Sequence, residues 1–261
     1  MFDSGFGGLT VARASIDLCP AEDLVYIGDT GRYPYGPRSE SEVRQFAREM
    51  SRSLVDEYGV KMIVVACNTA AAAAPVEQLS QEFGVPVIGV IEPGARALVS
   101  ATATGRIGVI GTVGTVRSGS YQRMISSLSP TAQLTVTACP GLVEFVEKGE
   151  TSGEQISVLT ERLLAPVHDA KVDALLLGCT HYPFLARVIG EVMGPDVVLV
   201  SSADETAFEV RALLARLGIA RPVGPLGEHV WLSSGDTSTF ARLGRQLLGP
   251  ELDSVQKWTP Q

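Results

Sequence analysis

Short apolar runs rich in Val and Ile alternate along this chain with longer segments of helical periodicity. Runs of four or five apolar residues are typical of parallel strands that are buried on both faces. The apolar runs are 24–27, 62–66, 87–91, 107–110, 134–138, 174–177, 197–200 and 230–232. The helical segments are 39–58, 70–83, 119–127, 153–165, 184–193, 203–217 and 237–248. This alternation predicts an α/β fold with mostly parallel sheets.

The two halves of the chain repeat the same landmarks at an offset of about 110 residues, within the uncertainty of boundaries taken from sequence. Cys67 corresponds to Cys179, Gly28 to Ala138 and Asp3 to Gly111, and the apolar run 87–91 corresponds to 197–200. Four landmarks match in the same order, which favours two copies of one α/β unit over chance alignment. The sequence therefore predicts an internal duplication.

We predict two similar α/β lobes from this duplication. Residues 1–92 plus 207–261 would form the first lobe, and residues 93–206 would form the second. In open parallel sheets, ligands bind outside the carboxyl ends of the strands. Two such lobes that face each other would place equivalent strand ends on opposite walls of one cleft, where we expect the active site.

The start of the chain is unusual for such a fold. Met1 and Phe2 lead directly into a Gly-rich turn that begins at Asp3, so the strand that would feed this turn is nearly absent. We interpret this start as truncated or displaced. We therefore expect the turn at Asp3 to be poorly anchored.

Composition argues against several classes of function. The formal net charge is −8, from 21 Lys and Arg against 29 Asp and Glu, and no basic cluster is present, so nucleic acid is not an expected partner. No apolar run approaches the roughly 18 residues of a membrane span, and we expect neither an export signal nor a membrane anchor. Four scattered cysteines without C-x-x-C spacing argue against a disulfide framework and a metal site. We expect a cytoplasmic protein with reduced thiols.

Cys67 and Cys179 occupy equivalent turns between an apolar run and a helical segment. Because the start of a helix favours negative charge, we expect the pKa of both thiols to lie below the usual value of about 8.5. A thiolate on one wall of a cleft can remove a proton from a carbon, and a thiol on the other wall can protonate the opposite face. A single cysteine is more often an inert apolar side chain, but a matched pair favours acid–base catalysis. We interpret Cys19 and Cys139 as inert apolar side chains without a catalytic role.

At these positions the sequence resembles the glutamate racemases of the aspartate/glutamate racemase superfamily. The matching segments, in the family's order, are 2–11 (FDSGFGGLTV), 28–30 (GDT), 34–36 (PYG), 66–70 (ACNTA), 90–93 (VIEP), 110–112 (IGT) and 177–183 (LGCTHYP). The resemblance implies a two-lobed enzyme that interconverts L- and D-glutamate without a metal or an organic cofactor. It also implies a role in supplying D-glutamate for peptidoglycan, and a homodimer.

The resemblance assigns roles to individual residues. Cys67 and Cys179 would transfer the protons, with Asp3 assisting Cys67 and His181 assisting Cys179, and Glu147 would hold His181. The implied substrate contacts are Asp3, Ser4, Tyr35, Gly36, Asn68, Thr69, Thr112, Thr115, Thr180 and His181. Hydroxyls, amides and backbone N–H groups can bind carboxylates without adding a further titratable group.

Four other interpretations compete with this one. An aspartate racemase of the same superfamily typically has an acidic residue where His181 stands. A pyridoxal-phosphate racemase needs a Schiff-base lysine, and Lys61, Lys148, Lys171 and Lys257 all lie outside the strand-end motifs. A cysteine hydrolase would have no use for the second thiol. A two-lobed amino-acid-binding protein would bind the ligand without turnover.

Overall fold

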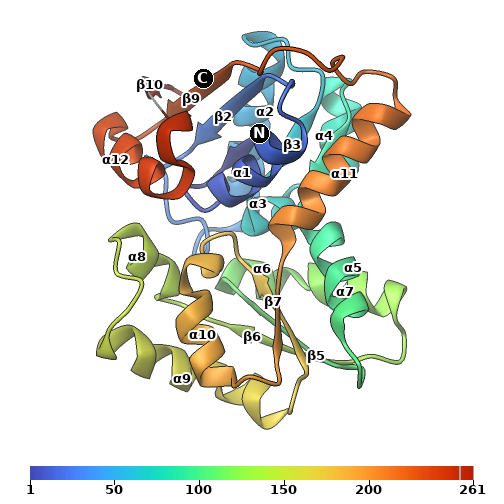
Figure 1. Ribbon diagram of the computed structural model, residues 1–261, viewed down its shortest axis with the longest axis vertical. Helices are drawn as coiled ribbons and strands as arrows, with labels where there is room; N and C mark the ends of the chain where they lie inside the picture. The colour runs from blue at the N-terminus through green and yellow to red at the C-terminus, as the bar shows by residue number, and fades with distance from the viewer. Residues whose placement is uncertain (253, 261) are drawn as a thin grey trace.

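The computed structural model describes residues 1–252 and 254–260, and its strands form two parallel sheets (Figure 1). The first sheet contains β1 (Phe2–Asp3), β2 (Leu24–Gly28), β3 (Ile63–Val65), β4 (Val87–Gly89), β9 (His229–Ser233) and β10 (Gln256–Lys257). The second contains β5 (Arg106–Gly111), β6 (Gln133–Ala138), β7 (Ala174–Gly178) and β8 (Val198–Ser201). We call each sheet with its helices a lobe.

The first lobe carries α1 (Leu9–Leu18), α2 (Glu40–Asp56), α3 (Asn68–Ala73), α4 (Val76–Phe83) and α12 (Thr237–Leu248), with the 3₁₀ turn η2 (Gly249–Glu251). The second carries α5 (Ile91–Ala101), α6 (Val113–Ser118), α7 (Ser120–Leu128), α8 (Leu142–Glu147), α9 (Glu154–Asp169) and α10 (Ala186–Met193), with η1 (Tyr182–Leu185). Helix α11 (Ser202–Arg216) leaves the second sheet and packs on the first lobe, as its path between the two in Figure 1 shows. In the described part of the chain, no helix is long and apolar enough to cross a membrane.

The strand order repeats in the two sheets. The first sheet has the order β10-β9-β2-β1-β3-β4, and the second has the order β6-β5-β7-β8. The units β2-β1-β3-β4 and β6-β5-β7-β8 are therefore equivalent, with β3 in the place of β7. This equivalence confirms the fold class that the repeated sequence landmarks predict, and it puts Cys67 and Cys179 after equivalent strands.

Each predicted apolar run overlaps a strand, but one predicted helix is wrong. Residues 70–83 do not form a single helix, because α3 ends at Ala73 and α4 begins at Val76. Pro75 lies between them, and a proline has no N–H and disfavours helical geometry in the residue before it. The break leaves α3 as a short helix whose start carries Cys67.

The two-residue strand β1 is firmly held, contrary to the expectation of a poorly anchored turn. It lies between β2 and β3, where Ile27 N–H donates to Met1 O at 3.0 Å and Ala66 N–H donates to Phe2 O at 2.9 Å. The Phe2 side chain is fully buried. Hydrogen bonds on both sides and a buried aromatic ring replace the length that the strand lacks, so Asp3 has a fixed position.

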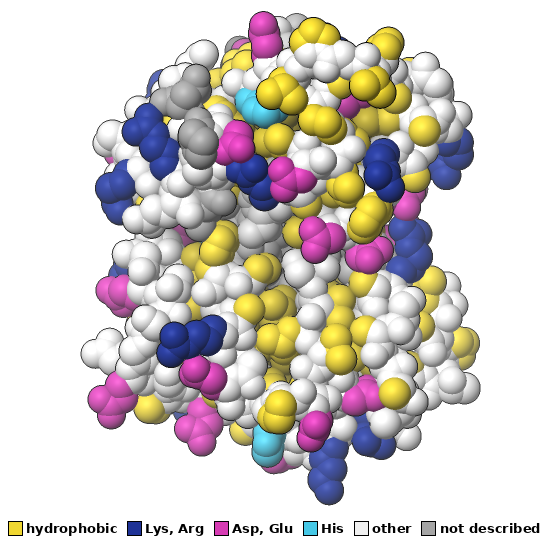
Figure 2. Space-filling view, viewed as in Figure 1, with side chains coloured by type: hydrophobic (Ala, Val, Ile, Leu, Met, Phe, Trp, Pro, Cys, Tyr) yellow, Lys and Arg dark blue, Asp and Glu magenta, His cyan; other side chains and the backbone are white. Residues whose placement is uncertain are grey.

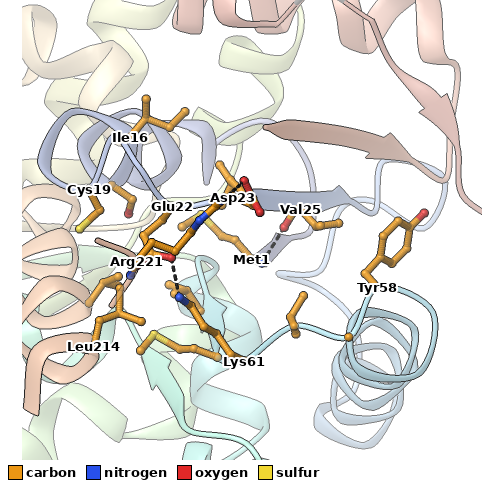
Figure 3. Close-up of a pocket in the computed structure, with 17 residues that line it drawn as sticks. Met1, Ile16, Cys19, Glu22, Asp23, Val25, Tyr58, Lys61, Leu214 and Arg221 are labelled. Atoms are coloured by element: carbon orange, nitrogen blue, oxygen red, sulfur yellow. Dashed lines mark hydrogen bonds and ion pairs between the residues drawn. The ribbon is translucent and has the colours of Figure 1, made fainter. Parts of the chain in front are cut away.

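One cavity on the first lobe lies away from the thiols (Figure 3). It has a volume of about 290 Å³ and lies at the amino ends of β2 and β3, where Met1, Cys19 and Leu24 line it. Its charged groups are paired, Lys61 with Glu22 at 2.6 Å and Arg221 with Asp23. Since ligands of parallel sheets bind at the carboxyl ends, the active site is expected at the opposite edge of the sheet.

We predict that Phe2→Ala lowers the free energy of unfolding by about 3–5 kcal/mol, because it empties a fully buried aromatic site in the centre of the sheet. Urea unfolding measures the change. Phe208→Ala is the matched control, since Phe208 is 44% exposed on α11 and should lose less than about 1 kcal/mol. Equal losses in the two variants would contradict the anchoring role of Phe2.

Candidate active site

A cleft of about 120 Å³ lies between the lobes at the carboxyl ends of the strands. Its first-lobe wall is formed by Asp3, Ser4, Tyr33, Pro34, Tyr35, Gly36, Pro37, Cys67, Asn68 and Thr69. Its second-lobe wall is formed by Thr112, Val113, Cys139, Pro140, Gly141, Val143, Glu144, Cys179, Thr180 and His181. None of the described residues that line this cleft is a Lys or an Arg. Figure 2 shows the Lys and Arg side chains on the visible face scattered among Asp and Glu.

Cys67 is the N-cap residue of α3 and lines the first-lobe wall. Its Sγ accepts a hydrogen bond from Ala70 N–H at 3.4 Å and lies 3.6 Å from Ser4 Oγ, to which the thiol donates. Ser4 Oγ in turn lies 3.5 Å from Asp3 Oδ1, while Gly8 N–H donates to Asp3 Oδ2 at 2.8 Å. A chain of hydrogen bonds thus connects the thiol to a buried carboxylate on β1.

The pKa of Cys67 is raised, which corrects the expectation of a lowered value. Burial is the largest cause, and the nearby negative charge of Asp3 adds to it. The hydrogen bonds from Ala70 N–H and with Ser4 act in the opposite direction but are outweighed. Cys67 therefore holds its proton in this state of the cleft.

Cys179 faces the cleft from the turn after β7, with His181 and Glu147 behind it. Cys179 Sγ lies 3.8 Å from His181 Nδ1, and His181 Nε2 lies 2.5 Å from Glu147 Oε1. His181 is almost fully buried, at 2% exposure. The imidazole therefore bridges a thiol and a carboxylate.

The pKa of His181 is raised well above 6.5 by this pairing. Burial by itself would lower it, but the hydrogen bonds with Cys179 and Glu147 and the negative charge of Glu147 have the larger combined effect. With both ring nitrogens protonated, His181 donates from Nδ1 towards Cys179 and from Nε2 to Glu147. Each thiol is thus connected to a different polar system, Ser4 and Asp3 on one wall and His181 and Glu147 on the other.

Glycines allow the walls to approach closely. A Cβ on Gly5 would lie 2.6 Å from Glu147 Oε1, and a Cβ on Gly36 would lie 3.2 Å from the Cβ of Thr112. A side chain at Gly5 would displace the Glu147 carboxylate, and one at Gly36 would require Thr112 to move. Glycine at position 5 therefore leaves the Glu147 carboxylate in place beside His181.

The hydroxyl of Tyr35 is engaged by a buried carboxylate. The hydroxyl donates to the carboxylate of Asp29, which is fully buried and also accepts hydrogen bonds from Arg32 Nε at 2.7 Å and from Ser234 Oγ at 2.5 Å. This network holds the loop that carries Tyr35 and Gly36 against the cleft. Tyr35 itself lines the cleft, as the sequence predicts.

Three threonine hydroxyls meet where the lobes join. Thr69 Oγ1 lies 2.9 Å from Thr112 Oγ1, and Thr115 Oγ1 lies 3.0 Å from the same atom. Thr69 and Thr112 line the cleft, whereas Thr115 is 1% exposed and lies behind them. The geometry gives Thr115 a supporting position rather than a wall position.

The comparisons with known proteins agree with this architecture. The family model for Asp/Glu/hydantoin racemases matches residues 9–210. The chain belongs to the Asp/Glu/hydantoin racemase family. A glutamate racemase from Parafrankia sp. is 51% identical over 256 residues, which cover 98% of this chain and 92% of the relative.

Solved racemase structures of this family have the same fold. The glutamate racemase isoform RacE1 from Bacillus anthracis has a TM-score of 0.93 and 41% identity, and the match covers 99% of this chain and 96% of that one. A glutamate racemase from Francisella tularensis in complex with D-glutamate has a TM-score of 0.91 and 29% identity, with coverage of 100% and 96%.

In this racemase the structure gathers nearly all of the sequence-predicted residues on the cleft walls, with Thr115 and Glu147 just behind them. Tyr33, Cys139 and Glu144 also line the cleft, although none of them was among the predicted site residues. Cys139 could have been found, because it follows β6 as Asp29 follows the equivalent strand β2. Burial, with a smaller effect from Cys179, raises the pKa of Cys139 to about 12, which keeps this thiol protonated.

We predict that Glu147→Gln lowers the pKa of His181, since the variant removes the carboxylate that favours the imidazolium. Because the pKa of His181 is raised, the stabilisation from its imidazolium is fully present below pH 6.5. It is lost as the pH rises through the pKa of His181 in the folded protein. Activity that needs the imidazolium should therefore be lost at lower pH in the variant. Profiles of kcat/KM against pH measure this shift. We also expect kcat to fall about tenfold, less than the roughly 10²- to 10⁴-fold loss on removing an acid–base group itself.

Glu150→Gln is the control for this prediction, because Glu150 is an exposed carboxylate three residues after Glu147. It should leave the profile unchanged. An alkaline limb at the same pH in wild type and Glu147→Gln would show that Glu147 does not act through His181.

Proposed function

We propose that this chain interconverts L- and D-glutamate by proton transfer between the α-carbon and two thiols, Cys67 and Cys179, without a metal or an organic cofactor. The observation that carries the proposal is that both thiols line one cleft from equivalent strand ends. The similarity to glutamate racemases, one of them in complex with D-glutamate, supports the choice of substrate. We assign residues 1–92 plus 207–261 and residues 93–206 as the two lobes that hold it.

The proposed reaction needs a base on one wall and an acid on the other. The thiolate of Cys179 takes the α-proton, the electron pair of the broken C–H bond stays on the α-carbon, and the S–H of Cys67 protonates the opposite face. The raised pKa of Cys67 supports its role as the donor in the described state. The thiols finish with exchanged protonation states, and the reverse reaction uses the opposite roles.

Neutral groups are proposed to hold the two carboxylates of the substrate. Ser4, Thr69, Thr112 and Thr180 offer hydroxyls on both walls, and Tyr35 and Gly36 line the same cleft. Asp3 and the buried, unpaired Oδ1 of Asn68 are acceptors for the ammonium group. Holding the substrate at both ends would place the α-carbon between the sulfurs, where orientation contributes much of the rate.

The alternative substrate is aspartate, which has one methylene fewer. One methylene changes the binding free energy of the transition state by only about 1–3 kcal/mol. Discrimination between glutamate and aspartate therefore depends on whether both carboxylates reach their hydrogen-bond donors. His181 next to Cys179 supports glutamate, by resemblance to the glutamate racemases. Aspartate is accordingly the comparison substrate in the assay.

We further propose a cellular role from the same resemblance. The chain would supply D-glutamate for peptidoglycan synthesis in the cytoplasm, where free thiols stay reduced. We also propose, from the same resemblance, that two copies of the chain form a homodimer.

We predict that racemisation in heavy water places solvent deuterium at the α-carbon of the inverted product, starting from either enantiomer of glutamate. Cys67→Ser and Cys179→Ser should each lower kcat by roughly 10²- to 10⁴-fold, because each removes one acid–base group. Circular dichroism follows inversion, and mass spectrometry follows deuterium.

Cys19→Ser is the matched thiol control, since Cys19 lines the distant cavity of Figure 3, and it should keep full activity. No inversion of either enantiomer by wild-type protein would overturn the proposed function. Inversion of aspartate but not of glutamate would replace the proposed substrate while keeping the two-thiol mechanism.

A further inference from the structure

Tyr121, the second residue of α7, lies outside the cleft wall and contacts both cysteine-bearing turns. Its side chain is buried, with 1% exposure, although it belongs to the second lobe near the junction with the first. The hydroxyl oxygen accepts a hydrogen bond of 2.6 Å from Asn68 Nδ2. Asn68 is the residue directly after Cys67, so this bond crosses from one lobe to the other.

The ring of Tyr121 packs against the opposite turn. A Cβ on Gly178, the residue before Cys179, would lie 3.1 Å from Tyr121 Cε2 and 2.7 Å from the backbone oxygen of Ile110. Gly178 therefore leaves the space that the ring occupies at the end of β7. A single rigid side chain thus touches the neighbours of both thiols.

The bond from Asn68 also determines which amide atom is available to a ligand. With Nδ2 directed to Tyr121, the opposite atom Oδ1 is buried and has no hydrogen-bond partner. Asn68 lines the cleft, so Oδ1 is a ready acceptor for a positively charged group. Burial raises the pKa of Tyr121 and keeps its hydroxyl neutral.

We propose that Tyr121 is a positioning residue that fixes the separation of the two thiol-bearing turns and the orientation of the Asn68 amide. The proposal rests on the two-thiol function proposed above. Among the residues that the structure describes, Tyr121 neither lines the cleft nor shares a hydrogen bond with a cysteine sulfur, and it acts through Asn68 and Gly178. Since a displacement of about 1 Å can reduce a rate by 10²-fold, a tie between the two turns matters for inversion.

The test is Tyr121→Phe, which keeps the ring against Gly178 and removes only the hydroxyl that holds Asn68. We expect kcat/KM for both enantiomers of glutamate to fall about tenfold or more, with KM raised because the Asn68 amide is no longer fixed. In heavy water, a proton removed by one thiol should more often be replaced by solvent deuterium from the same side. The ratio of deuterium in recovered substrate to deuterium in inverted product should therefore rise.

This ratio separates positioning from a purely structural role. Both quantities come from the same folded molecules, so the ratio does not depend on how much of the variant folds. Ser118→Ala is the matched control, because it removes a 2.6 Å hydrogen bond to Thr115 O inside the second lobe, next to α7. Its ratio should equal that of wild type.

A Tyr121→Phe enzyme with the wild-type ratio and wild-type kcat/KM would overturn the positioning role, and so would a lower activity with an unchanged ratio. These results are distinct from failure of the proposed function, in which wild-type protein itself inverts neither enantiomer.

Discussion

Parallel pairing of the strands fixes where the chemistry of this molecule can take place. Because β2-β1-β3-β4 and β6-β5-β7-β8 are parallel units of the same order, their carboxyl ends deliver equivalent turns to the walls of one cleft. Cys67 and Cys179 line one cleft for that reason. The Gly-rich turn after β1 and the loop held by Asp29 then close the remaining sides.

Burial and helix geometry compete at the first thiol, and their magnitudes decide the outcome. A negative charge at a helix start is stabilised by about 0.3–1 kcal/mol at exposed sites and by up to about 2 kcal/mol when it is partly buried. Complete burial can shift a pKa by about 3–5 units, and each unit corresponds to about 1.4 kcal/mol. For Cys67 the larger effect is burial, supported by Asp3. Position at a helix start therefore does not by itself identify a thiolate.

Much of the fold follows from patterns that are local in sequence. Apolar runs locate the strands and the repeated landmarks reveal the duplication, because both depend on short-range periodicity. Helices α1, α5, α6 and α8 were not predicted. Only α6 and α8, with six residues each, are too short for a periodic signal. The break at Pro75 was overlooked in an alanine-rich segment whose composition favours a continuous helix.

Site residues could be predicted where they lie in a sequence motif. Contacts between residues of the two lobes could not, because they depend on tertiary packing. The cysteines stand in recognisable turns, whereas Tyr121 and Asn68 meet only after two lobes dock. Thr115 illustrates the limit, because it shares a turn with Thr112 yet lies behind the wall. Residue type and spacing do not say which side of a helix start will face a cleft formed by another part of the chain.

The lack of cationic side chains on the cleft wall has a kinetic consequence for an anionic ligand. Clefts lined by opposite charge can raise association rates by about 10–10³-fold through long-range attraction, and this cleft has no such lining among its described residues. The whole chain has a net charge of −8, so a dicarboxylate approaches through a repulsive field. Neutral donors act only at contact distance. Dissolved salt, with a screening length of about 8 Å at physiological ionic strength, would therefore speed the entry of the ligand rather than slow it.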